Sequence, residues 1–158
     1  MGGYGSETIQ QRLQQIKAKD IMSRFAITTT RGTLLTEVAH LMSRFKISGV
    51  PVMGKNKEIC GIITATDLFG VLDKITRDDS DTANPSKYYD IPVETIMSEK
   101  VYSITEDTSL YDMIKLMCQK NIHTLPVLSG AEIVGVVGRR DVLNAGYAAI
   151  RKQGDSKN

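Results

Sequence analysis

Cysteine is scarce in this sequence, and the placement of the few cysteines argues against several kinds of small protein. Only Cys60 and Cys118 occur, and neither belongs to a C-x-x-C pair. A disulfide framework or a zinc site needs more cysteines at short spacings, so neither is expected. Each cysteine stands in an apolar run, which predicts two buried free thiols. Free thiols are typical of a reducing compartment, and we therefore expect a cytoplasmic protein.

The sequence also lacks an excess of charge and any long apolar run. Its 20 Lys and Arg are balanced by 18 Asp and Glu, which gives a net charge of +2. This balance provides no long-range attraction to nucleic acid or membrane, and no basic stripe with interleaved aromatics is present. No apolar stretch approaches the roughly 18 residues that a transmembrane helix requires. We therefore expect neither nucleic acid nor a membrane as a partner.

Catalytic constellations are missing as well. The chain has two histidines and two isolated cysteines. We find no nucleophile–base pair, no cluster of metal ligands and no phosphate-binding P-loop. The sequence therefore predicts a protein that is not an enzyme, has no metal site and requires no cofactor for catalysis.

An internal repeat organises the chain. The tripeptide I-M-S at residues 21–23 recurs at 96–98, which is 75 residues further along. After the loss of one residue, GIITATD at 61–67 falls on GVVGRRD at 135–141, with an offset of 74. Matches that hold one register across a whole unit indicate that the unit was duplicated.

Each repeat predicts the element order β-α-β-β-α from its hydrophobic periodicity and turn residues. In the first repeat we expect a strand at 26–30, a helix at 34–45, strands at 49–53 and 58–64, and a helix beginning near Asp67. In the second we expect a strand at 101–105, a helix at 110–120, strands at 124–128 and 132–138, and a helix beginning near Asp141. Thr33 and Thr108 are the predicted N-caps.

The position of each strand in its sheet is predicted from its composition. A proline cannot donate to a strand ladder, so Pro51 and Pro126 are expected at a strand start or at a sheet edge. The strands at 58–64 and 132–138 are apolar on both faces and are expected to be central.

The repeats divide the chain into five segments. These are an N-terminal tail and helix at 1–16, a first repeat at 17–73, a connecting loop at 74–91, a second repeat at 92–149 and a C-terminal tail at 150–158. The predicted fold class is α/β (α+β), with an extra N-terminal helix. This polar helix, predicted at 6–20, has Ile9, Leu13 and Ile16 on one stripe and is expected to lie across the core.

The duplicated pattern resembles a tandem cystathionine-β-synthase (CBS) domain pair, also called a Bateman module. The resemblance is carried by the DIMS and TIMS openings, the ISGVPV and IHTLPV segments and the two aspartate turns, and it covers about residues 17–149. It implies two repeats packed sheet to sheet about a pseudo-twofold axis, with two clefts between them. It also implies a regulatory ligand (AMP, ADP, ATP or S-adenosylmethionine) and an unknown protein partner. Because no further domain is attached within these residues, we expect a stand-alone CBS-domain-containing protein.

The two aspartate turns are the main candidate site. Asp67 and Asp141 each follow a strand and open a helix, where unpaired N–H groups and partial positive charge favour an anion. Each carboxylate can accept both hydroxyls of a ribose diol, or it can simply cap its helix. The repeat favours the ribose role. The resemblance gives the hydroxyls of Thr64 and Thr66 the role of donating to ligand phosphate.

The second turn differs from the first in charge. Gly138 stands where the family usually places Ser or Thr, so one phosphate donor is missing. Arg139 and Arg140 precede Asp141 and can bind phosphate, or they can remain solvated surface residues. In family members with a histidine at the position of His123, that side chain approaches ligand phosphate. The turns are therefore predicted to be inequivalent, with the second favouring the more highly charged phosphate.

The resemblance also implies that the adenine frame of each cleft comes from one repeat and the ribose aspartate from the other. The residues expected to face Asp141 are Met22, Ile27, Ile47, Ser48 and Gly49. The residues expected to face Asp67 are Met97, Tyr102, Ile122, His123 and Thr124. Apolar walls suit adenine, although ordinary core packing explains the same residues. Tyr88 and Tyr89 can stack on a base or pin the connecting loop to the core.

Two functions follow from the resemblance. The first is a regulatory sensor that binds an adenosine compound and transmits a conformational signal to a partner. The alternative is a ligand-independent dimerisation or protein-interaction module, favoured by the glycine at position 138. Because family members often pair two modules through their helices, the resemblance also implies a homodimer.

Overall fold

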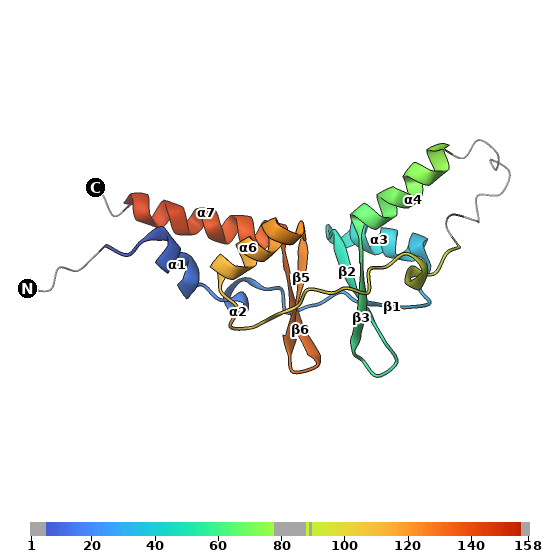
Figure 1. Cartoon of the computed structure of the whole chain (residues 1–158), viewed down its shortest axis with the longest axis horizontal. Coiled ribbons are helices and arrows are strands. Elements are labelled where there is room, and N and C mark those ends of the chain that lie inside the picture. Colours follow the sequence, from blue (N-terminus) through green and yellow to red (C-terminus); the bar gives the residue numbers. More distant parts are fainter. Residues whose placement is uncertain (1–5, 78–87, 89, 156–158) are drawn as a thin grey trace, which may run out of the picture. The chain divides into compact units, whose positions relative to one another are not determined.

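Two sets of β-α-β-β-α elements follow one another along the chain, as the repeat predicts (Figure 1). The structure is a computed structural model and describes residues 6–77, 88 and 90–155. The first set is β1 (Thr29–Thr30), α3 (Leu35–Phe45), β2 (Gly49–Met53), β3 (Ile59–Thr64) and α4 (Ala65–Arg77). The second set is β4 (Ile104–Thr105), α6 (Leu110–Lys120), β5 (Thr124–Ser129), β6 (Glu132–Gly138) and α7 (Arg139–Asp155). Helices α1 (Ile9–Gln15) and α2 (Ala18–Ile21) precede the first set, and the 3-10 helix η1 (Val93–Thr95) precedes the second. The predicted fold class is confirmed.

Each set forms its own three-stranded sheet, and its middle strand is the one that contains the proline. The strand orders are β1-β2-β3 and β4-β5-β6. Strands β1 and β4 run parallel to their neighbours β2 and β5, while β2 and β3 are antiparallel. The predicted central strands at 58–64 and 132–138 are therefore outer strands, which corrects the expectation from their apolar faces. The outer edge of each of these strands forms a single bridge, to Ser98 for β3 and to Ser23 for β6.

Pro51 in the middle strand β2 is also a correction, because we expected it at a strand start or a sheet edge. It lies opposite Ile62 of β3. The N–H and C=O of Ile62 are bonded to Ser98, at 2.9 Å in each direction, and so point away from β2. The pair is thus of the non-hydrogen-bonded kind, and the nitrogen of Pro51 faces β1. Strand β1 pairs only with Val52 and Met53, so no ladder donor is lost.

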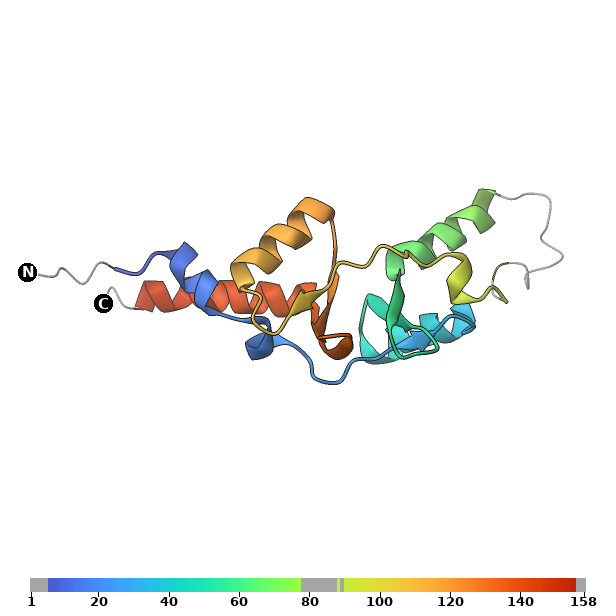
Figure 2. The ribbon, with the colours of Figure 1, turned by 60° about the horizontal axis from the view of Figure 1, so that its bottom comes forward.

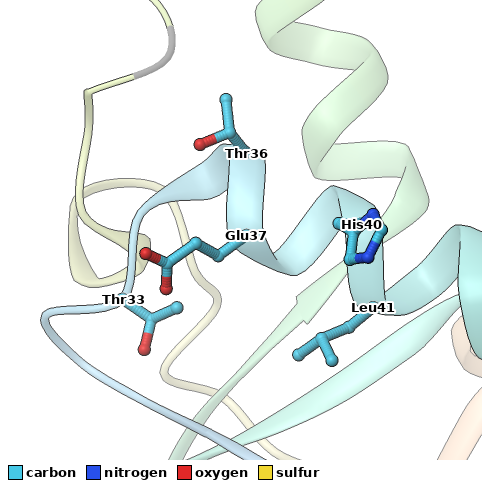
Figure 3. Close-up of a pocket in the computed structure, with 5 residues that line it drawn as sticks. All are labelled: Thr33, Thr36, Glu37, His40 and Leu41. Carbon is cyan, nitrogen blue, oxygen red and sulfur yellow. The ribbon is translucent and has the colours of Figure 1, made fainter.

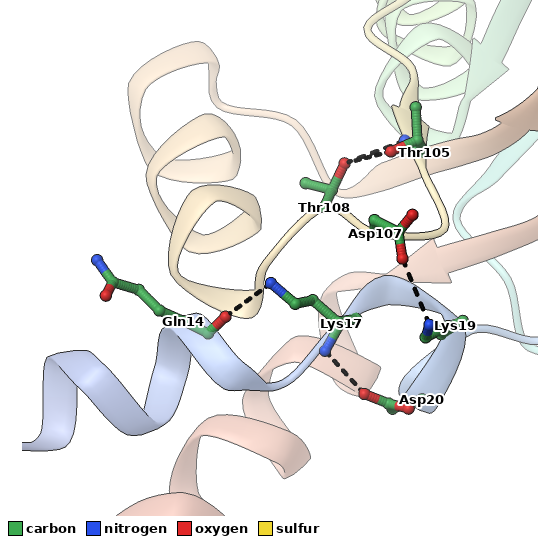
Figure 4. Close-up of polar contacts among 7 residues, drawn as sticks. All are labelled: Gln14, Lys17, Lys19, Asp20, Thr105, Asp107 and Thr108. Carbon is green, nitrogen blue, oxygen red and sulfur yellow. Dashed lines mark hydrogen bonds and ion pairs between the residues drawn. The ribbon is translucent and has the colours of Figure 1, made fainter. Parts of the chain in front are cut away.

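The helix starts are displaced by one residue from the predicted caps. The N-caps are Leu34 and Ser109 rather than Thr33 and Thr108. The Ser109 hydroxyl accepts from the N–H of Asp112 at 3.1 Å. Thr108 instead closes the preceding turn, where its hydroxyl accepts from the N–H of Thr105 at 3.0 Å (Figure 4). A threonine hydroxyl can accept from a backbone N–H of a turn or of a helix start. The Thr108 hydroxyl accepts from the turn, so Ser109 caps the helix.

The chain divides into two compact units that differ from the sequence repeats. Unit 1 contains the described parts of Met1–Phe25, Ser103–Ser129 and Val134–Asn158, and unit 2 those of Ala26–Tyr102 and Gly130–Ile133. The opening segment of each repeat therefore packs on the body of the other repeat. Equivalent bonds attach the two segments: the N–H of Ala18 donates to Thr108 at 2.9 Å, and that of Val93 donates to Thr33 at 2.8 Å.

The N-terminal helix predicted at 6–20 is interrupted. Helix α1 ends at Gln15, Ile16 and Lys17 are extended, and α2 follows. The break allows the Ile16 carbonyl to accept from the N–H of Leu110 at 2.8 Å. The Lys17 N–H is bonded to Asp20 Oδ2 at 2.8 Å, and the Lys17 ammonium to the carbonyl of Gln14 at 3.0 Å (Figure 4). Within unit 1, α1 lies against α6 and α7 (Figure 2).

Each unit has an apolar core between its sheet and its helices. In unit 2 the buried cluster consists of Leu35, Val38, Met42, Val50, Val52, Ile63, Val93 and Met97. In unit 1 the fully buried side chains include Leu110, Met113, Leu125, Val127 and Val137. Burial of a large aliphatic side chain contributes about 1.5–3 kcal/mol, so these clusters account for much of the stability of each unit.

The prediction of two buried thiols is wrong for Cys118. Cys118 is exposed, and Cys60 is half-buried with its thiol donating to the Val52 carbonyl at 3.3 Å. On α6 the buried face is formed by Leu110, Met113 and Met117. The next residue is rotated by about 100° around the helix axis, which turns the Cys118 side chain away from that face.

Candidate functional site

The first aspartate turn joins β3 to α4 and is closed by reciprocal hydrogen bonds. The N–H and the hydroxyl of Thr64 both donate to Asp67 Oδ2, at 2.8 and 3.0 Å. In return, the Thr64 hydroxyl accepts from the N–H of Asp67 at 3.3 Å. This is a capping box in which Thr64 is the residue before the helix and Asp67 is its third residue.

The second turn joins β6 to α7 and contains half of the same arrangement. The N–H of Gly138 donates to Asp141 Oδ2 at 2.8 Å. Because glycine has no side chain, the reciprocal bond to the N–H of Asp141 cannot form. A Cβ atom at Gly138 would lie 3.5 Å from Asp141 Oδ2, which is an ordinary contact. The missing hydroxyl is therefore a property of the sequence and not a steric requirement of the turn.

The capping and ligand-binding roles of the aspartates are compatible with each other. In both turns the cap uses Oδ2, and neither Asp67 nor Asp141 has a hydrogen bond through Oδ1 to any described residue. Both side chains are half-buried. The cap fixes the orientation of each carboxylate and leaves one oxygen as an acceptor.

This geometry corrects one expectation. The aspartates are the third helical residues rather than N-cap residues, because each helix begins two residues before its aspartate. The Thr64 hydroxyl donates to Asp67 Oδ2 in this structure, and its role toward a ligand phosphate stays a prediction. The signal was present in the sequence, because Thr-x-x-Asp directly before an apolar run is typical of a capping box. Thr66 is exposed, and its hydroxyl has no partner in the part of the chain that the structure describes.

The two helix starts differ in how many backbone donors remain unpaired. The first N–H of α4, at Ala65, donates to the Ser48 carbonyl at 2.8 Å, and the Asp67 N–H donates to Thr64. Only the N–H of Thr66 then lacks a partner among the described residues. A single unpaired N–H at the start of α4 provides one backbone donor for an anion.

At α7 the first N–H, that of Arg139, donates to the His123 carbonyl at 2.9 Å. The next two, at Arg140 and Asp141, have no partner among the residues that the structure describes. The second turn thus has two backbone donors for an anion, one more than the first.

Arginine side chains stand at positions of the second turn whose equivalents in the first turn are uncharged. Nη1 of Arg139 lies 3.5 Å from Nε2 of His123, which precedes β5. Arg139 and Arg140 are exposed, and neither forms an ion pair with a described residue. The equivalent positions at the first turn are Ser48, Ala65 and Thr66, which carry no charge.

The structure brings together part of the predicted adenine frame. Met22 belongs to unit 1 and its sulfur lies next to Gly135 of β6, the strand that leads to Asp141. Met97 lies in the same way next to Gly61, on the strand that leads to Asp67.

Tyr102 lies in unit 2 together with Asp67, the aspartate that it is expected to face. Each of the remaining frame residues lies in a different unit from its expected aspartate. These residues are Ile27, Ile47, Ser48 and Gly49 in unit 2, and Ile122, His123 and Thr124 in unit 1. Their pairing with the opposite aspartate stays a prediction. Gly49 and Thr124 are buried in their own units. Tyr88 is half-buried, and Tyr89 lies outside the described residues.

Two surface hollows lie elsewhere. One, of about 410 Å³, is lined by Thr33, Thr36, Glu37, His40 and Leu41 of unit 2 (Figure 3). The other, of about 620 Å³, lies in unit 1 and is lined by α1, α2 and the alanines of α7. No predicted site residue lines either hollow. Among the described residues there is no helix long and apolar enough to cross a membrane and no group of three metal-ligating side chains.

The comparisons with known proteins agree on one family. The family model for the CBS domain matches residues 18–74 and 93–148. Homoserine O-acetyltransferase of Methanosphaera stadtmanae is 29% identical over 143 residues, which are 90% of this chain and 26% of that protein. Inosine-5'-monophosphate dehydrogenase of Methanocaldococcus jannaschii is 24% identical over 152 residues, 90% of this chain and 28% of that protein. The chain thus spans about a quarter of the length of these two curated relatives.

Solved structures match nearly the whole chain. CBSX2 in complex with AMP has a TM-score of 0.68 and 20% identity, covering 87% of this chain and 98% of that chain. The CBS domain pair of protein MJ0100, in complex with 5-methylthioadenosine and S-adenosyl-L-methionine, has a TM-score of 0.67 and 24% identity, covering 89% and 98%. At these identities the similarity shows the fold alone.

Proposed function

Since the chain belongs to the CBS domain family, we propose that it is a regulatory module that binds an adenosine compound at its aspartate turns. The observation that carries this proposal is the pair of fixed carboxylates. In each turn Oδ2 is held by the cap, and Oδ1 has no hydrogen bond to a described residue. Proteins of the same fold were solved with AMP, 5-methylthioadenosine and S-adenosyl-L-methionine, which supports this ligand class.

The chemistry of the turn suits a ribose and its 5′ group. A carboxylate oxygen accepts strong hydrogen bonds from the two hydroxyls of a ribose diol. The unpaired N–H groups at the helix start donate to an anionic or polar 5′ substituent. The ligand then favours one of the arrangements that the module can adopt, and a protein partner senses that arrangement.

A panel of adenosine compounds tests this proposal. A ligand at 100 times its dissociation constant is expected to stabilise the folded state by about 2.7 kcal/mol, which raises the melting temperature. The measurement is a thermal-shift series with adenosine, AMP, ADP, ATP and S-adenosylmethionine, with GMP as the matched control for a purine nucleotide. If none of the adenosine compounds raises the melting temperature above the GMP value, the alternative of a ligand-independent interaction module is favoured.

Exposed apolar side chains on α4 and α7 support a homodimer. Phe69 and Leu72 of α4 are 69% and 55% exposed, and Leu143, Tyr147 and Ile150 of α7 are 49%, 68% and 46% exposed. Clustered exposed apolar groups are typical of interaction surfaces.

We expect light scattering to give a dimer at micromolar concentration and Phe69→Glu to give a monomer, because a buried unpaired carboxylate opposes association. Lys74→Glu, on the opposite face of the same helix, is the matched control and should remain dimeric. A wild-type monomer at this concentration would contradict the homodimer.

A further inference from the structure

We infer that the two turns select ligands by charge. The α7 turn binds an adenosine compound with a polyphosphate, and the α4 turn binds one whose 5′ substituent has little or no negative charge. This inference rests on the proposed function, because it assigns a ligand class to each of the two proposed sites. It starts from the fact that the two turns share their backbone path and their carboxylate but differ in the number of unpaired N–H groups and in the charge of their side chains.

The backbone donors differ first. The α7 turn has two unpaired N–H groups, those of Arg140 and Asp141, whereas the α4 turn has one, that of Thr66. The difference comes from one residue, because Thr64 occupies the N–H of Asp67 and Gly138 cannot occupy that of Asp141. Loss of the cap hydroxyl therefore adds an anion donor at the same turn. The two helices are long enough, at 13 and 17 residues, for these N–H groups to have a substantial positive partial charge.

The side chains differ in the same direction. Arg139 and Arg140 are at the first two positions of α7, where the helix dipole disfavours cations. Arg139 also approaches His123, at 3.5 Å between Nη1 and Nε2, and neither arginine forms an ion pair with a described residue. Two guanidinium groups thus lie at a helix start, a place that favours an anion, and the His123 ring lies beside one of them. Such a local conflict is typical of a functional site and is relieved when a phosphate binds to the guanidinium groups.

The α4 turn has no compensating charge. At the equivalent positions, Ser48 and Thr66 have hydroxyls and Ala65 has no polar side chain, and the Thr64 hydroxyl is occupied by Asp67. Among residues 64–67 of the turn, the charged groups are the Asp67 carboxylate and the partial charge of the helix start. A polyphosphate placed here would bring several negative charges close to the carboxylate without a cation of the turn between them. A neutral or weakly charged 5′ substituent avoids this repulsion.

Single-turn variants separate the two sites. Asp67→Asn leaves the α7 turn as the intact site, and Asp141→Asn leaves the α4 turn, while each asparagine can still accept the capping bond. Each variant is titrated by calorimetry with adenosine, AMP, ADP and ATP at low salt. In Asp67→Asn the dissociation constant is expected to fall roughly tenfold with each of the first two phosphates, as expected for charge-assisted hydrogen bonds. In Asp141→Asn it should rise or change by less than about threefold over the same series.

Exchange of the side chains provides the matched control. In the Asp67→Asn background, Arg139→Ala with Arg140→Thr introduces the side chains of Ala65 and Thr66 at the α7 turn and should reduce the preference for ATP over adenosine by roughly ten- to a hundredfold. In the Asp141→Asn background, Thr66→Arg introduces one guanidinium at an exposed position and should create a preference for ATP.

Two results would overturn the inference. If adenosine binds but both single-turn variants show the same dependence on phosphate number, charge selection is wrong and the proposed function stands. If neither variant nor the wild type binds any of the four compounds, the proposed function fails and the inference fails with it.

Discussion

Asparagine in place of Asp67 or Asp141 is expected to weaken binding of an adenosine compound at that turn by roughly ten- to a hundredfold. The amide has the shape of the carboxylate, and its oxygen can still accept the N–H of Thr64 or Gly138. The second position becomes an NH2 group, which cannot accept from a ribose hydroxyl. Calorimetry of each variant with AMP measures the effect. If both variants bind AMP with the affinity of the wild type, the carboxylates do not contact the ligand.

A matched variant distinguishes binding from capping. Thr64→Ala removes the reciprocal cap of the first turn and leaves the Asp67 carboxylate in place. Loss of an N-cap hydroxyl is expected to lower the free energy of unfolding by about 1 kcal/mol. Asp67→Asn should lower the free energy of unfolding less than Thr64→Ala does, as measured by urea unfolding. It should weaken ligand binding more than Thr64→Ala does, as measured by calorimetry. The reverse order would indicate that the aspartate acts only as a cap.

Alanine in place of Gly61 or Gly135 is expected to destabilise the protein by about 1–3 kcal/mol, because each position is overpacked by a single added carbon. A Cβ atom at Gly135 would lie 2.8 Å from the Met22 sulfur and 2.8 Å from the Ser23 carbonyl oxygen. At Gly61 it would lie 2.6 Å from the Met97 sulfur and 2.9 Å from the Ser98 carbonyl oxygen. The methionine can move, but the carbonyl belongs to the segment that pairs with the strand. Urea unfolding measures the loss.

Glycines in the two helices are the controls for this effect. A Cβ atom at Gly70 or at Gly146 meets nothing within 4 Å. Alanine is the better helix former, so Gly70→Ala and Gly146→Ala should stabilise by about 0.5–1 kcal/mol. The expected result is that alanine lowers the free energy of unfolding at the two strand glycines and raises it at the two helix glycines. Destabilisation of similar size at all four positions would show that close packing against Ser23 and Ser98 is not the reason that β3 and β6 have glycine.

Local patterns predicted the elements well where one strong signal decided them. Helix α6 has the predicted bounds, because its apolar stripe ends where Asn121 takes a left-handed conformation. The middle and outer strands were interchanged, because two apolar faces indicate that a strand is covered above and below the sheet and do not indicate its place in the strand order. The short pairing of β1, only Thr29 and Thr30, depends on contacts that strand propensity does not describe.

The organisation of the units could not be predicted from the repeat. An offset of 75 shows which segments resemble each other, but it does not show which segments pack together. Residues 18–25 belong to the first repeat by sequence and to unit 1, with the body of the second repeat, by contact. For the site, the sequence identified both aspartates, and the structure added the reciprocal cap and the number of unpaired N–H groups. Those features depend on where each helix begins, and helix starts were predicted only to within two residues.

The central claim is that a ribose diol is bound by the free oxygen of a capped aspartate. The most direct test is calorimetric titration of the wild-type protein with AMP and with 2′,3′-dideoxy-AMP, which differ only in the two hydroxyls. The account predicts that AMP binds and that the dideoxy compound binds roughly a hundredfold more weakly, since two hydrogen bonds to a charged acceptor are lost. Equal affinity for the two compounds would contradict it.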